Sequence, residues 1–105
     1  MYRGTTPTLI FNLSKTSELD FEDLSEIWVT LKLKAYSKTW KMSECVLDNE
    51  EKTITITLTQ EDTLKMPSTE HMKAQIRFLM NDGTALATNI VDVNINDILK
   101  EGVIT

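Results

Sequence analysis

The fold follows from one stretch of sequence: Glu26-Ile27-Trp28-Val29-Thr30-Leu31-Lys32-Leu33-Lys34. Its odd-numbered residues are all aliphatic, and polar or amphipathic residues alternate with them. A period of two places alternate side chains on opposite faces of a strand. Because isoleucine, valine and threonine favour the extended conformation, the stretch predicts a β-strand with one buried face.

The same alternation recurs on both sides of this stretch. It predicts three further strands, over residues 8–13, 53–59 and 71–80. Asn81-Asp82-Gly83 tolerates positive φ, which predicts a tight hairpin turn into a last strand over residues 84–95. The apolar parity changes between residues 40 and 47, which predicts a β-bulge near Ser43.

Only one short helical turn is predicted, near residues 60–65. Thr59 is a typical N-cap residue, acidic residues follow it, and Pro67 ends the turn. The linker over residues 14–25 is long for a hairpin, and we expect it to cap one end of the molecule. Its apolar residues are Leu19, Phe21 and Leu24.

Six to eight short antiparallel strands and one helical turn predict an all-β protein. The expected fold is an antiparallel β-sandwich, immunoglobulin-like or related, with a small barrel as the alternative. The length of 105 residues fits a single domain over residues 1–105. Within it, residues 96–105 form a tail that packs on the domain or on a partner.

Charge and composition narrow the classes of partner. The formal net charge is −5 and the pI is about 4.8, which disfavours nucleic acid. No apolar run approaches the roughly 20 residues of a membrane span, and the N-terminus lacks the apolar centre of a signal peptide. We therefore expect no membrane insertion and no secretion by the general route.

The sequence offers no catalytic constellation, and we expect no enzyme, no cofactor and no metal. His71 and Cys45 are the single histidine and the single cysteine, so one chain cannot supply the usual four nitrogen or sulfur ligands of zinc. Cys45 lies on an apolar strand face, where cysteine usually acts as a small buried hydrophobe. It has no partner for an internal disulfide.

Two groups of apolar residues are candidate binding sites. The tail holds four large apolar side chains where a terminus is usually polar: Ile98, Leu99, Val103 and Ile104. They either fold back over an open end of the sandwich or dock on a neighbouring subunit. Trp28 and Trp40 are a possible stacking platform for a sugar ring, although Trp28 also fits the edge of the core.

Three stretches stand out in chain order: Arg3-Gly4-Thr5-Thr6-Pro7-Thr8, Leu58-Thr59-Gln60-Glu61-Asp62-Thr63 and Asp82-Gly83-Thr84-Ala85-Leu86-Ala87. In this order they resemble a family of small proteins encoded in tail modules of phages and prophages of Gram-positive bacteria. Through Asp23-Leu24-Ser25 and the strand from Ile27, the chain resembles, more distantly, the N-terminal β-sandwich of phage upper-baseplate proteins.

The resemblance implies a noncatalytic tail or baseplate component that contacts itself, another phage tail or baseplate protein, or both. It would lie in the virion tail, or in the host bacterial cytoplasm during assembly. Two other classes stay open: a glycan-binding β-sandwich module that uses an exposed tryptophan, and a small acidic inhibitor steered to its target by charge.

Overall fold

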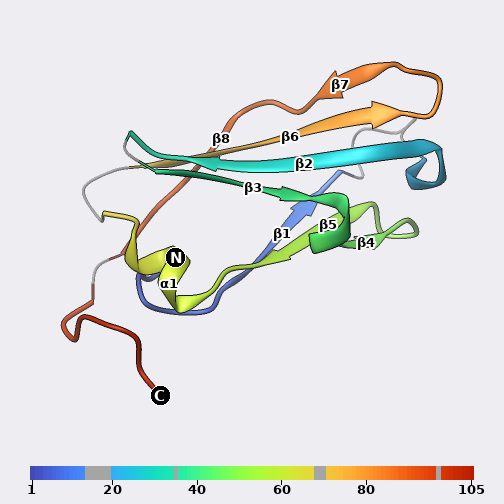
Figure 1. The fold of residues 1–105 in the computed structure, drawn as a ribbon. Helices are drawn as coiled ribbons and strands as arrows, with labels where there is room; N and C mark the ends of the chain where they lie inside the picture. The colour runs from blue at the N-terminus through green and yellow to red at the C-terminus, as the bar shows by residue number, and fades with distance from the viewer. Residues whose placement is uncertain (14–19, 35, 68–70, 97) are drawn as a thin grey trace.

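A computed structural model places two antiparallel sheets face to face, with one helical turn at one end (Figure 1). It describes residues 1–13, 20–34, 36–67, 71–96 and 98–105. The first sheet has the order β3-β2-β6-β7, with β8 also paired to β6, and the second has the order β1-β5-β4. The predicted all-β, sandwich-like fold is confirmed.

The strands of the larger sheet are β2 (Leu24–Lys32), β3 (Ser37–Lys41), β6 (Met72–Met80), β7 (Ala85–Ala87) and β8 (Val91–Val93). Those of the smaller sheet are β1 (Thr8–Asn12), β4 (Val46–Asp48) and β5 (Thr53–Thr57). The predicted strands over residues 8–13, 26–34, 53–59 and 71–80 are therefore present, with ends that differ by a few residues at most.

The core lies between the two sheets and follows the predicted alternation. In β2, Ile27, Val29 and Leu31 are fully buried. They pair in register with buried residues of β6, so the central strands present one continuous apolar face. The smaller sheet adds Ile54 and Ile56 of β5. Burying each such side chain stabilises the fold by about 1.5–3 kcal/mol.

The helical turn is α1 (Gln60–Leu64), and Thr59 caps it as predicted. The Thr59 hydroxyl accepts a hydrogen bond from the Asp62 N–H at 3.1 Å, and the Asp62 carboxylate accepts one from the Thr59 N–H at 3.0 Å. This reciprocal capping box satisfies donors that a short helix otherwise leaves free. Among the described residues, no helix has the length and apolarity needed to cross a membrane.

Two details of the predicted strands are wrong. The parity change near Ser43 is not a bulge but a 3-10 turn, η2 (Met42–Glu44), which carries the chain from one sheet to the other. The last strand, predicted over residues 84–95, is interrupted between β7 and β8. There the Thr88 hydroxyl accepts a hydrogen bond from the Ile76 N–H, in the place of a backbone carbonyl.

Another 3-10 turn, η1 (Phe21–Asp23), closes the end of the sandwich opposite α1 (Figure 1). Phe21 and Leu24 are buried there, as expected for the linker, although Leu24 already belongs to β2. The expectation for Leu19 falls outside the described residues. The hairpin turn after β6 packs beside η1, because the Asn81 N–H donates to the Asp23 carbonyl at 2.8 Å.

Candidate functional site

The C-terminal tail, residues 98–105, starts beside α1 and the N-terminus (Figure 1). Gln60 of α1 holds it at Ile104 through two hydrogen bonds. Its side-chain amide donates to the Ile104 carbonyl at 2.9 Å and accepts from the Ile104 N–H at 2.8 Å. A glutamine side chain used in this way mimics the pairing of a neighbouring strand, so the tail backbone is fixed at this point.

Arg3 provides the second anchor of the tail. One guanidinium nitrogen donates to the Glu101 carboxylate at 2.6 Å. Two others donate to the carbonyls of Leu64 and Met66, at 3.0 and 2.8 Å. These carbonyls lie at and beyond the end of α1, where a helix leaves acceptors unsatisfied and a cation is favourable. Arg3 thus joins the N-terminal segment, the helix end and the tail.

The four apolar tail residues differ in exposure. Ile98 is half-buried, and an added Cβ on Gly4 would lie only 2.8 Å from its Cδ1 atom. By contrast, Leu99 is fully exposed, and Val103 and Ile104 are 50% and 58% exposed. The structure therefore places one of the four against the domain and leaves three in solvent, on a backbone that is held in place.

The two tryptophans lie on opposite faces of the larger sheet. Trp40 of β3 pairs with Val29 of β2, faces the core and is 4% exposed. Trp28 faces outward and is half-buried, beside a shallow groove of about 380 Å³ that Thr39 and Arg77 also line. The structure does not bring the two rings together as one platform.

Cys45 follows η2 and is half-buried. Its thiol donates to the Lys41 carbonyl at 3.2 Å. Burial, with smaller contributions from Glu44 and Glu26, raises the pKa of the Cys45 thiol to about 11. Thiolate is the nucleophilic form, so the environment of Cys45 suppresses its reactivity at neutral pH. His71 is exposed and directly precedes β6.

Within the described ranges, no group of three or more His, Cys, Asp and Glu side chains is placed to hold a metal ion. The carboxylate of Asp62 has several partners, and it serves the structure. It is buried and accepts hydrogen bonds from the Lys38 ammonium at 2.9 Å and the Tyr36 hydroxyl at 3.3 Å. These bonds join α1 to the residues at the start of β3.

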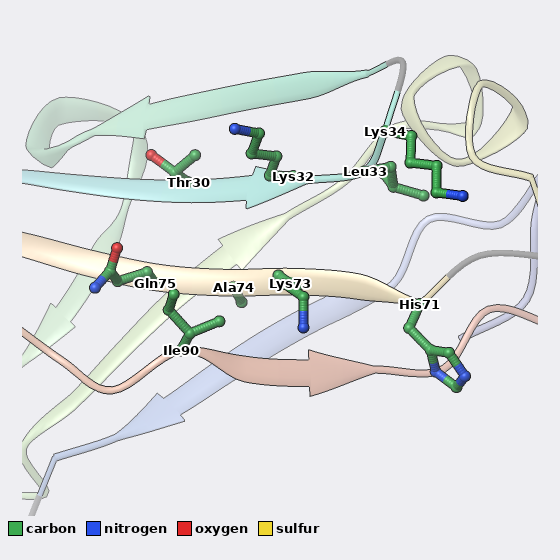
Figure 2. Close-up of a pocket in the computed structure, with 9 residues that line it drawn as sticks. All are labelled: Thr30, Lys32, Leu33, Lys34, His71, Lys73, Ala74, Gln75 and Ile90. Atoms are coloured by element: carbon green, nitrogen blue, oxygen red, sulfur yellow. The ribbon is translucent and has the colours of Figure 1, made fainter.

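A cationic groove of about 630 Å³ lies on the outer face of the larger sheet (Figure 2). Thr30, Lys32 and Lys34 line it from β2 and the residues just after that strand, and His71, Lys73 and Gln75 line it from β6 and its start. Lys32 and Lys73 stand directly opposite each other in the strand register.

Sequence reasoning missed the cationic groove. Each strand shows its outward polar residues in the alternation, so the lysines could be assigned to an outer face. Their proximity depends on β2 and β6 being neighbours, although about 40 residues of chain separate them. Nothing in the alternation sets that strand order.

An apolar cleft opens along one side of the sandwich, between the edge strands β1 and β7. It encloses about 540 Å³ and is lined by Ile10 and Phe11 of β1 and by Leu86 and Val91 of the other sheet. Ile10 is 65% exposed. Both strands are edge strands of their sheets, and an edge strand is a common place for another chain to add to a sheet.

Comparisons of the chain with protein-family models, with curated proteins and with solved structures each find no match. The resemblance to phage tail-module proteins therefore stays a prediction that rests on its three stretches of sequence.

Proposed function

We propose that this protein is a noncatalytic structural or assembly component of a phage tail or baseplate, and that it acts through protein–protein contacts. The observation that carries the proposal concerns the C-terminal tail, residues 98–105. Leu99, Val103 and Ile104 are exposed there, on a backbone that Gln60 and Arg3 hold in position.

A held tail is suited to docking for a thermodynamic reason. Association is opposed by the entropy lost when flexible segments become ordered, and a segment that is already ordered loses less. Leu99, Val103 and Ile104 would then bury apolar area at roughly 25 cal/mol of stabilisation per Å². Contacts of this size are individually weak, and repetition by symmetry in an assembly multiplies them.

The assignment to a phage tail or baseplate is supported by the family resemblance alone. The apolar cleft between β1 and β7 supports the more general part of the proposal, because it offers a second surface for a neighbouring protein.

The experiment is incorporation into particles in the host that carries the gene. The triple variant Leu99→Ser, Val103→Ser and Ile104→Ser is expressed in place of the wild type, and tail assemblies are separated on a gradient. Quantitative mass spectrometry then measures the protein in each fraction. The matched control is Val46→Ser, which removes a similarly exposed apolar side chain from β4.

Wild-type protein and the Val46→Ser control are expected in tail assemblies or their intermediates, and the triple variant is expected to remain unassembled. Its melting temperature should equal that of the wild type, because the three side chains contribute little to the core. Wild-type protein that is absent from every assembly fraction would contradict the proposal. Loss of the fold in the triple variant would show that the tail serves the domain itself.

A further inference from the structure

The cationic groove brings three lysines together on a protein whose net charge is −5, and Leu33, Ala74 and Ile90 add apolar side chains to its lining. Lys73 forms an ion pair with Asp92 at 2.9 Å. Lys32 and Lys34 make no ion pair with any other residue that the structure describes. Lys32 lies directly across from Lys73 in the register, but their side chains point away from each other, Lys32 away from β6 and Lys73 away from β2 (Figure 2). The exposed ammonium groups of Lys32 and Lys34 can therefore pair with carboxylates from outside the chain.

The β4–β5 hairpin lies at the end of the molecule away from α1 (Figure 1). The tip of the β4–β5 hairpin carries Asp48, Glu50 and Glu51. The Asp48 carboxylate accepts hydrogen bonds from the Glu50 and Glu51 N–H groups, at 3.0 and 3.1 Å, which fixes the turn. The side chains of Glu50 and Glu51 remain exposed. We call residues 48–51 the acidic tip.

The turn η1 extends this acidic surface. Asn49 connects the acidic tip to it, because its side chain accepts from the Phe21 N–H at 3.0 Å and donates to Asp20 at 3.2 Å. Asp20 therefore lies beside the tip, and η1 carries two more acidic residues after it, Glu22 and Asp23. Among the residues that the structure describes in the hairpin turn, only Lys52 is positively charged. Its ammonium group lies over the Phe21 ring of the same chain, 5.4 Å from the ring centroid.

We propose that the acidic tip of one copy docks in the cationic groove of a second copy of this chain. The complementary charges of two fixed surfaces on one chain support this choice of occupant. Polyanions such as nucleic acid are disfavoured by the net charge, whereas the hairpin delivers only a few carboxylates on a narrow turn. Because tip and groove are different surfaces, each copy keeps one of each, and the contact can repeat along an assembly.

This inference rests on the proposed function and deepens it by naming a second copy as a partner. The test uses the purified full chain and measures self-association by sedimentation velocity. At about 0.01 M salt the Debye length is roughly 30 Å, and at about 1 M salt it is roughly 3 Å. Wild-type protein should associate at low salt and dissociate at high salt.

Two charge-reversed variants locate the contact. The groove variant is Lys32→Glu with Lys34→Glu, and the tip variant is Glu50→Lys with Glu51→Lys. The groove variant should fold, because Lys32 and Lys34 are both exposed and form no ion pair with another described residue. The control Lys41→Glu with Lys65→Glu changes the net charge as much as the groove variant does, at two exposed lysines outside both the groove and the C-terminal tail.

Each charge-reversed variant alone should raise the Kd of self-association by at least roughly tenfold, because it brings like charges together across the contact. The control should stay near the wild type. An equimolar mixture of the two variants should associate again, because the wild-type tip of one then meets the wild-type groove of the other.

A wild type that is monomeric at low salt, or a mixture that stays dissociated, would overturn the inference. Either result would leave the proposed function standing if the protein still enters tail assemblies through its C-terminal tail. If the protein self-associates but does not enter tail assemblies, the inference stands and the proposed function is contradicted. The two tests therefore distinguish the two claims.

Discussion

Asp62 connects α1 to the residues around the start of β3. Burial by itself would raise the pKa of its carboxyl, but hydrogen bonds from Thr59 and Lys38 outweigh burial and hold the pKa below its ordinary value. A lowered folded-state pKa means that the ionised form stabilises the fold. That contribution is complete above the unfolded-state pKa of about 3.9 and is lost as the pH falls through the folded-state pKa.

We predict that Asp62→Asn lowers the free energy of unfolding by about 1–3 kcal/mol at pH 7, because Lys38 loses its charged partner and the capping box is weakened. Urea unfolding between pH 3 and pH 7 measures this. The difference from the wild type should shrink as the pH falls below about 4. The control Asp92→Asn removes an exposed ion pair and should change stability little. A difference that is constant with pH would contradict this role for Asp62.

The candidate site could be predicted only in part at this scale. The sequence was enough to single out the four apolar tail residues, because large apolar side chains are unusual at a terminus. It was not enough to show that Arg3 and Gln60 anchor them, since both contacts join segments that are far apart in the chain. The same limit applies to Trp28 and Trp40. The sequence does not show that β2 and β3 are neighbours, and their register places the two rings on opposite faces of one sheet.

Among the elements, strands were predictable and their arrangement was not. Alternation identifies β2, β5 and β6 because one face of each is buried and the other is not. The break between β7 and β8 has a different cause, a single side chain that takes the place of a backbone acceptor. Thr88 makes this contact by accepting from the Ile76 N–H at 3.1 Å, while its own N–H donates to the Ile76 carbonyl at 2.9 Å.

Replacing this hydroxyl tests the explanation of the break. Thr88→Val keeps the shape of the side chain and leaves the Ile76 N–H without its acceptor, in a strand whose inward residues are buried. We predict a loss of about 1–3 kcal/mol in the free energy of unfolding, together with faster exchange of the Ile76 amide hydrogen. Thr57→Val, at an exposed position of β5, is the control. Unchanged exchange at Ile76 would contradict the assignment.

The whole molecule is elongated, with principal extents of 47 × 27 × 20 Å, and its surfaces are unlike one another. The C-terminal tail lies toward the α1 end, as do the end of β2 and the start of β6, whose residues line the cationic groove, and the β4–β5 hairpin lies at the other end (Figure 1). The buried residues that the structure describes are apolar, apart from Asp62 and Thr63, which serve α1. We propose that these surfaces contact other proteins.

Hydrogen–deuterium exchange on the free protein and on the protein within purified tail assemblies tests this account most directly. The account predicts that amides of residues 98–105 exchange much more slowly in the assembly, while those of the β2 and β6 interior exchange at the same slow rate in both. Equal exchange of the amides of residues 98–105 in the free and the assembled protein would contradict the account.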